Sequence, residues 1–448
     1  MMLIRILSST DTDFSRQFAV IRERGASTND AVDQQARRIV EAVRRRGDRA
    51  VIEMTSRYDG VKLKPATLRV GEREIAAALA AVPAAEIRAL RLAARRIAAF
   101  HKRQVTRSWS YRDALGFKLG QQITPLSRVG VYVPGGHAAY PSSVLMNAVP
   151  ARVAGVREVI MVSPRGRAGF NPAVLAAASI AGVDAVYQVG GAQAVAALAY
   201  GTQTIPAVDK IVGPGNAWVQ AAKKMVYGTV DIDGIAGPSE VLVIADRTAN
   251  PAYVAADLLA QAEHGSGDEC AVLLTTSRPL AIAVQAELAR QLAVLPRRAD
   301  IARVLKRRGA LVVVRDLNEA VTVADQVAPE HLELIVAGAE RWAPRIRNAG
   351  AMFLGPYAPA PLGDYLAGPN HVLPTGGSAR FFSPLGVYHF VKRTSVVSAT
   401  RRGLQRLAPS IERLAKLEGY QAHAAAVQIR FARTSERRRR QGGRNGKG

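Results

Sequence analysis

Residues 210–226 read KIVGPGNAWVQAAKKMV and combine a short apolar run, a glycine-rich turn and a helical pattern. The run KIV (210–212) predicts a buried strand, and the turn Gly213-Pro-Gly-Asn216 follows it directly. The next ten residues, 217–226, space their apolar side chains as one face of a helix does. A strand, a turn and a helix in this order form the repeating unit of a parallel α/β sheet.

The same unit recurs upstream of this stretch. The run EVIMVS (158–163) precedes a helix that we expect Asn171 to cap and Gly182 to end. A second apolar run at 185–189 passes through two glycines into the helical pattern AQAVAALAY (192–200). Three units in succession predict one parallel sheet.

A second series of units begins with EVLVIAD at 240–246. Its first helix is predicted to start at Asn250 and Pro251, because asparagine favours the N-cap and proline the first helical turn. Further buried strands are expected from the apolar runs at 270–276, 310–314 and 332–336. The chain therefore carries two sheets.

Outside these units, apolar residues at helical spacing predict helices over 33–46, 72–101 and 409–431. We expect an α/β fold with two Rossmann-like α/β domains, one inserted in the other, plus helical N- and C-terminal arms. The expected parts are an N-terminal arm at 1–26, a larger α/β domain at 27–131 and 240–385, an inserted α/β domain at 132–239, a C-terminal helical dimerisation arm at 386–432 and a basic disordered tail at 433–448.

Length and composition limit the class of protein. The chain has 448 residues, 48% of them hydrophobic, and a single cysteine, Cys270. One cysteine forms no internal disulfide and no multi-cysteine metal or iron–sulfur site, so we expect a cytoplasmic protein. We also expect neither a signal peptide nor a membrane span, because no stretch of about 18 apolar residues runs without charge or turn residues.

The charge balance raises the possibility of nucleic-acid binding. Lysine and arginine number 61 against 36 acidic residues, for a formal net charge of +25. However, the arginines are scattered and aromatic residues make up 6% of the chain, so stacking platforms for bases are not visible. The dense cluster, Arg437 to Arg440, lies in the tail. We expect no nucleic-acid partner, and a polyanion-binding role of the tail stays as an alternative.

Candidate chemistry lies where imidazoles, carboxylates and amides gather. Gln261 and His264 stand three residues apart at a predicted helix end, which lets both reach one ion but equally suits a polar helix terminus. Glu330 and His331 follow Pro329 just before a predicted strand, where they could move protons or form an ordinary connection. The stretch 363–371 holds a carboxylate and an imidazole in a Gly/Pro/Asn-rich loop.

Two further side chains, Glu418 and His423, lie on the predicted C-terminal helix, where spacing alone decides nothing. For nucleotides, the chain has neither G-x-G-x-x-G after the first strand nor a P-loop lysine motif. The glycine-rich turns at 132–136, 190–193 and 213–216 could instead present backbone amides to a pyrophosphate at helix N-termini. Each turn alone is a weak signal.

Taken in order, these segments resemble the histidinol dehydrogenase family, whose members catalyse the last two oxidations of histidine biosynthesis. The resemblance covers nearly the whole chain except the arginine-rich tail. Its motifs are VGVYVPGG (129–136), QVGGAQAVAALAYGT (188–202), KIVGPGN (210–216), AGPSEVLVIAD (236–246), QAEH (261–264), APEHLEL (328–334) and GDYLAGPNHVLPTGG (363–377).

The resemblance implies oxidation of L-histidinol to L-histidine through histidinal, in two successive hydride transfers that each use NAD+. It implies one Zn2+ per subunit, held by Gln261, His264, Asp364 and His423. His331 is then the general base for the substrate alcohol, and Glu330 activates the water that adds at the aldehyde stage. The substrate contacts that it implies are Ser239, Gln261, His264, His331, Asp364, His371, Glu418 and His423.

The same resemblance implies contacts of Tyr132, Gln193 and Asn216 with NAD+. It also implies a homodimer in which His423 and Glu418 come from the partner subunit. An alternative is a related NAD-linked zinc dehydrogenase of another small alcohol, such as a sulfonated diol, although Glu418 favours a cationic substrate. The chain departs from the family pattern at Asp231, Gly234, Ala360 and His389, which are neither implied ligands nor proton carriers.

Overall fold

The computed structural model describes residues 3–24, 30–135, 139–166, 169–264 and 267–432, so the predicted basic tail lies outside the described residues. These residues divide into two compact units. Unit 1 comprises the described parts of 1–105 and 125–391, and unit 2 comprises 106–124 and 392–432. The predicted α/β class with parallel sheets is confirmed in unit 1.

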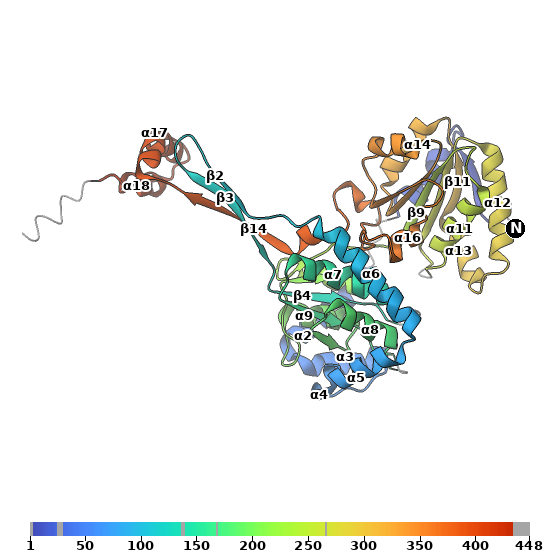
Figure 1. Ribbon diagram of the computed structural model, residues 1–448, viewed down its shortest axis with the longest axis horizontal. Coiled ribbons are helices and arrows are strands. Elements are labelled where there is room, and N and C mark those ends of the chain that lie inside the picture. Colours follow the sequence, from blue (N-terminus) through green and yellow to red (C-terminus); the bar gives the residue numbers. More distant parts are fainter. Residues whose placement is uncertain (1–2, 25–29, 136–138, 167–168, 265–266, 433–448) are drawn as a thin grey trace, which may run out of the picture. The chain divides into compact units, whose positions relative to one another are not determined.

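The first sheet of unit 1 has six parallel strands, and their side chains are largely buried because helices cover both faces. In spatial order the strands are β1 (Arg5–Ser8), β11 (Gly309–Val313), β10 (Cys270–Thr275), β9 (Glu240–Ala245), β12 (His331–Ile335) and β13 (Ala351–Leu354). On one face lie α11 (Pro251–Ala262), α12 (Arg278–Leu292) and α13 (Arg298–Arg308). On the other lie α1 (Phe14–Arg22), α14 (Leu317–Val327) and α15 (Ala339–Trp342). Figure 1 labels α14 on this side of the sheet.

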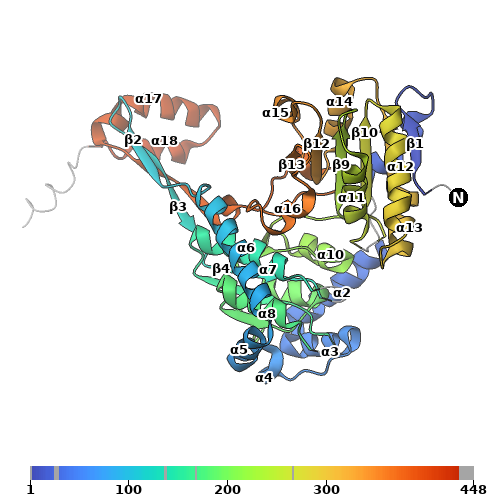
Figure 2. The ribbon, with the colours of Figure 1, turned by 45° about the vertical axis from the view of Figure 1, so that its right-hand side comes forward.

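The second sheet of unit 1 has five parallel strands. Their order is β6 (Ala185–Tyr187), β5 (Glu158–Val162), β4 (Arg128–Tyr132), β7 (Lys210–Val212) and β8 (Asp231–Ile232). One face is covered by α5 (Glu72–Ala81), α6 (Ala84–Lys102), α7 (Pro141–Ala154) and α8 (Pro172–Ala181). The other face is covered by α2 (Asp30–Arg46), α3 (Asp48–Asp59), α4 (Pro65–Leu68), α9 (Gly191–Tyr200) and α10 (Ala217–Val226), as Figure 2 shows for α2 and α10.

The predicted helix caps are confirmed by their hydrogen bonds. The Asn171 side chain accepts from the backbone N–H of Ala173, and Asn250 accepts in the same way from Ala252. Gly182 ends α8 with φ +72°, a left-handed conformation that glycine adopts without a side-chain clash. Local sequence therefore fixes where these helices begin and end.

The packing of the N-terminal half differs from the expected domain boundaries, which placed 27–131 with the larger domain. The helices of residues 30–102 bury their apolar faces against the five-stranded sheet, together with β4. Residues 1–26 were expected as a separate arm, yet β1 pairs with β11 at the edge of the six-stranded sheet. The predicted helix over 72–101 is two helices, because Pro83 separates α5 from α6.

The C-terminal arm was expected to be helical, but unit 2 contains strands as well as helices. It contains a three-stranded sheet in the order β14 (Val391–Ser398), β3 (Lys118–Pro125), β2 (Trp109–Arg112) and two helices, α17 (Arg401–Leu417) and α18 (Gln421–Gln428). The single helix predicted over 409–431 is wrong: α17 begins earlier, at a cap formed by Thr400, and the chain turns at Gly419 with φ +78°.

The remaining short elements are α16 (Ala360–Tyr365) and the 3-10 turns η1 (Ala343–Arg345), η2 (Ser378–Arg380) and η3 (Val387–His389). Within the described ranges, no helix has the length and apolar content needed to cross a membrane.

Candidate functional site

The predicted catalytic pair lies at the amino end of β12, beside the amino end of the neighbouring strand β9. His331 is the first residue of β12, Glu330 precedes it, and Glu240 is the first residue of β9. The register pairs His331 with Val241, which brings these three residues together. Ligand sites of open α/β sheets usually lie at the carboxyl ends of the strands, so this site uses the opposite edge.

A tight connection delivers Glu330 and His331 to this edge. Ala328 ends α14 with φ +47°, and it is the one residue other than glycine with positive φ among the described residues. Backbone amides of Gly350 and Ala351 then donate to the carbonyls of Pro329 and Glu330, both at 2.9 Å. A Cβ on Gly350 would lie 2.6 Å from the Glu330 carbonyl oxygen, so only glycine fits this approach without movement of the backbone.

The Glu330 carboxyl group is buried and fixed. Its Oε2 atom accepts a hydrogen bond of 2.8 Å from the Glu240 backbone N–H. Burial raises the pKa of Glu330 to about 7, although the neighbouring His331 acts in the opposite direction. A carboxyl group with a pKa near neutrality can both take and return a proton at physiological pH.

The His331 ring is held by its Nδ1 atom, which donates to the Glu240 carbonyl oxygen at 2.9 Å. This bond leaves Nε2 free, 3.6 Å from Asp364 Oδ1. Burial favours the neutral ring, but the Glu330 carboxylate and Asp364 outweigh it and raise the pKa of His331 to about 9. A cation at Asp364 would oppose part of this effect, since it would offset one of the two carboxylates.

Two of the four predicted zinc ligands, His264 and Asp364, influence each other, and a third, Gln261, lies at the end of the helix that precedes His264. Because α11 runs back along the sheet, its end brings Gln261 to the amino ends of the strands, and His264 follows two residues after the helix. His331 and the histidines His264 and His371 lower the pKa of Asp364 against the effect of burial. Desolvation lowers the pKa of His264, opposed chiefly by Asp364.

Two predicted substrate contacts border this cluster. His371 donates through Nδ1 to the Asp364 carbonyl oxygen at 2.9 Å, and its Nε2 lies 3.4 Å from the Ser143 hydroxyl oxygen on α7. Burial lowers the pKa of His371. Ser239 is half-buried immediately before Glu240, and its carbonyl oxygen accepts from the Cys270 backbone. The structure therefore gathers Ser239 and His371 with the catalytic pair.

The remaining two predicted site residues, Glu418 and His423, belong to unit 2. Both side chains are exposed there: Glu418 ends α17, and the His423 ring lies 5.0 Å from the Tyr420 ring. Across the described residues, no group of three or more His, Cys, Asp or Glu side chains is arranged to hold a metal ion.

The predicted NAD contacts lie at the topological switch point of the five-stranded sheet. The strand order β6-β5-β4-β7-β8 reverses between β4 and β7, and such a crevice is where open α/β sheets bind ligands. Tyr132 ends β4, and its buried hydroxyl accepts from the Gly191 backbone at 3.0 Å. Burial raises the pKa of Tyr132 to about 12, so it stays neutral.

The other two predicted contacts stand at helix N-termini beside this point. Asn216 follows β7 and caps α10 by accepting from the Val219 backbone at 3.1 Å. Gln193 lies buried in the first turn of α9. Helix N-termini with free amides favour anions.

Three of the four departures from the family pattern have local partners. Asp231 pairs with the buried ammonium of Lys210 at 2.5 Å, and the His389 ring accepts from the Gly386 backbone at 3.0 Å. Gly234 has φ +154°, which other residues rarely adopt. The Ala360 backbone donates to Glu333 Oε1 at 2.8 Å.

Sequence reasoning missed the residues that support the catalytic pair, above all Glu240, Arg24 and Gly350. In the sequence, Glu240 looks like the first residue of an apolar strand, and its partner Arg24 is 216 positions away. The one available signal was a carboxylate at the head of an otherwise apolar run, since buried charges need partners.

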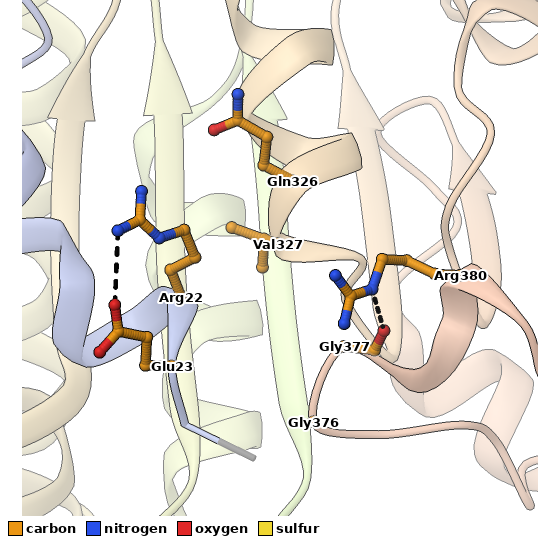
Figure 3. Close-up of a pocket in the computed structure, with 7 residues that line it drawn as sticks. All are labelled: Arg22, Glu23, Gln326, Val327, Gly376, Gly377 and Arg380. Atoms are coloured by element: carbon orange, nitrogen blue, oxygen red, sulfur yellow. Dashed lines mark hydrogen bonds and ion pairs between the residues drawn. The ribbon is translucent and has the colours of Figure 1, made fainter. Parts of the chain in front are cut away.

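A separate pocket of about 390 Å³ lies in unit 1 (Figure 3). Its lining is polar, and Arg380 Nε is occupied by a hydrogen bond of 3.0 Å to the Gly377 carbonyl oxygen. Its lining residues are Arg22, Glu23, Gln326, Val327, Gly376, Gly377 and Arg380, none of which is a predicted site residue.

Comparisons with known proteins agree with the resemblance. A family model described as Histidinol dehydrogenase matches residues 22–431. Histidinol dehydrogenase of Syntrophotalea carbinolica is 55% identical over 432 residues, covering 96% of this chain and 99% of that protein. The enzyme of Aquifex aeolicus is 51% identical over 431 residues, with 96% and 99% covered. The crystal structure of histidinol dehydrogenase from Elizabethkingia anophelis matches with a TM-score of 0.91 at 35% identity, covering 96% of this chain and 98% of that one.

Proposed function

We propose that this chain, which belongs to the histidinol dehydrogenase family of oxidoreductases in histidine biosynthesis, oxidises L-histidinol to L-histidine through histidinal with Zn2+ and two successive NAD+. The observation that carries the proposal is the buried pair of Glu330 and His331, fixed on Glu240 and facing Asp364. We also propose that the enzyme acts in the cytoplasm.

The side chains at this edge fit a zinc ion. Gln261 is buried, and the Nε2 atom of its amide finds no hydrogen-bond partner among the described residues. The oxygen and nitrogen of a side-chain amide can exchange places by a flip of about 180°. A flip of Gln261 would therefore put its oxygen at the position without a partner, where it could bind a metal ion. His264 and Asp364 supply the nitrogen and oxygen donors that zinc prefers. We therefore propose Gln261, His264 and Asp364 as ligands of one Zn2+, with His423 as the fourth.

Bound zinc supplies a Lewis acid that holds the substrate, and bound NAD+ supplies a hydride acceptor. The Nδ1–H of His331 is committed to the Glu240 carbonyl, so the ring would take the proton of the substrate alcohol at Nε2. A pKa of about 9 keeps both ring nitrogens protonated at neutral pH, so this role requires that a cation bound at Asp364 lower the pKa of His331. Glu330 removes a proton from the water that adds at the aldehyde stage, for which its pKa of about 7 is suited. Ser239 and His371 contact the substrate beside this pair.

We propose that Tyr132, Gln193 and Asn216 contact NAD+. They lie at the switch point of the five-stranded sheet, where the N-termini of α9 and α10 favour a pyrophosphate. The chain lacks the usual G-x-G-x-x-G motif for dinucleotides, so the turns before α9 and α10 would bind the pyrophosphate in its place.

The proposal includes a homodimer. Unit 2 carries Glu418 and His423 with exposed side chains, and we propose that each subunit receives these residues from its partner. A carboxylate such as Glu418 near the substrate amine favours a cationic amino alcohol over a sulfonated diol, since it repels a sulfonate. Mixing inactive His423→Ala with inactive His331→Ala subunits should restore part of the activity.

The direct test follows NADH formation by the purified zinc-loaded chain with L-histidinol. We expect turnover by the wild type and a loss of 10²- to 10⁴-fold in His331→Ala, the range typical of general acid–base groups. His389→Asn is a matched control, because an amide oxygen can accept the same bond from Gly386 and the residue lies outside the proposed site. Absence of turnover, or full activity in His331→Ala, would refute the proposal.

A further inference from the structure

Glu240 joins the two catalytic residues through its backbone. Its N–H donates to Glu330 Oε2 at 2.8 Å, and its carbonyl oxygen accepts from His331 Nδ1 at 2.9 Å. The first bond fixes the carboxyl group, and the second fixes the ring and the nitrogen that carries its proton. The position of one residue at the head of β9 thus determines the orientation of both groups.

The side chain of Glu240 in turn fixes that position. Its carboxylate accepts from Arg24 Nε and Nη2, both at 2.5 Å, and the pair is almost completely buried, with side-chain exposures of 4% and 3%. It also accepts from the backbone N–H of Gly376 at 2.7 Å and from that of Glu330 at 3.3 Å. Four donors from three distant segments therefore converge on one carboxylate.

Arg24 also forms hydrogen bonds to the ends of two helices. Its guanidinium donates to the Ile21 carbonyl oxygen at the end of α1 and to the Val327 carbonyl oxygen at the end of α14, at 3.0 and 2.9 Å. Val327 directly precedes the strained Ala328 that starts the connection to the catalytic pair. The pocket of Figure 3 borders this network, because Val327 and Gly376 also line it.

A buried ion pair is weak evidence for stability, since two apolar side chains of similar volume often stabilise a fold as well or better. The bonds of this pair, however, are made to the backbone segments that carry the catalytic groups. We propose that Glu240, with Arg24 as its counter-charge, is a positioning residue that sets the geometry of Glu330 and His331. This inference rests on the proposed function.

The test separates positioning from stability with two variants. Glu240→Gln keeps the shape but leaves the Arg24 charge unpaired, so we expect a less stable protein. Arg24→Met combined with Glu240→Gln removes both charges, so we expect stability to return towards that of the wild type. If the carboxylate positions the catalytic pair, kcat is 10- to 100-fold below the wild-type value in both variants. The KM for L-histidinol and the zinc content stay within twofold of the wild-type values.

Glu158→Gln is the matched control. Glu158 is the first residue of β5 and pairs with Arg128 at 2.6 Å, so it reproduces an arginine–glutamate pair at a strand head outside the proposed site. We expect its kcat within twofold of the wild type. A wild-type kcat in the folded Glu240→Gln enzyme or in the double variant would overturn this inference but not the proposed function. A wild-type chain without turnover would refute the proposed function, and this inference with it.

Discussion

Replacing Glu330 by glutamine tests whether the buried carboxyl group carries the electrostatic cost that the structure assigns to it. The substitution keeps the size of the side chain and an oxygen that can accept from the Glu240 backbone. It removes the ionisation. Burial raises the pKa of Glu330 from 4.5 to about 7, and one pKa unit is worth about 1.4 kcal/mol, so ionisation in the folded state costs about 3 kcal/mol.

The sign of the effect follows from proton binding in the two states. Between pH 4.5 and about 7 the unfolded chain has released the proton of Glu330 while the folded chain still holds it. The contribution of Glu330 to the stability of the wild type therefore falls as the pH rises through this window and levels off above it. Glu330→Gln lacks this contribution, so its stability should gain about 3 kcal/mol on the wild type over the same window.

Urea unfolding followed by fluorescence of the three tryptophans, at several pH values and one protein concentration, measures this difference. Glu287→Gln is the control, because the half-buried Glu287 pairs with Arg290, which lowers its pKa, and a gain over this window is not expected. Parallel stability curves for the wild type and Glu330→Gln would refute the assignment of a buried, raised pKa.

Gly350→Ala should lower kcat on the order of tenfold with little change in KM, because its Cβ would meet the Glu330 carbonyl oxygen; wild-type kcat in steady-state assays would contradict this. Ala328→Gly should leave the free energy of unfolding unchanged or raise it by up to about 1 kcal/mol, since glycine adopts φ +47° without strain; a clear loss of stability on urea unfolding would count against it. Deletion of 433–448, with seven basic and one acidic residue, should weaken retention on heparin while kcat/KM stays within twofold; a large loss of activity would show that the tail serves the reaction.

Short-range features could be predicted because they depend on neighbouring residues. Asn171 and Asn250 cap helices through their own side chains, and the strand–turn–helix units required only the order of apolar runs and glycines. Glu330 and His331 were singled out because they follow a helix-ending proline, and their role stays a prediction. The predictions of caps and strands hold because the interactions that determine them act within a few residues.

Long-range packing could not be predicted in the same way. An amphipathic helix such as 33–46 shows that one face is buried but not which sheet buries it, and the expected domain boundary missed its packing on the five-stranded sheet. Likewise, the bond between Arg24 and Glu240 connects residues that no local pattern relates. Residues that hold a proposed catalytic pair in place can therefore come from any part of the chain that the fold brings into contact with it.

The two sheets present opposite edges to their proposed ligands, and helix polarity gives the reason. At the carboxyl ends of β4 and β7 stand the N-termini of α9 and α10, where the positive end of the helix dipole favours the proposed pyrophosphate of NAD+. At the amino ends of β9 and β12 stand the C-termini of α11 and α14, where the negative end of the helix dipole favours positive charge, as in the bond from Arg24 to the Val327 carbonyl. The second edge adds carboxylates and suits a zinc ion and a cationic amino alcohol. The sign of the charge thus assigns each proposed ligand to its edge.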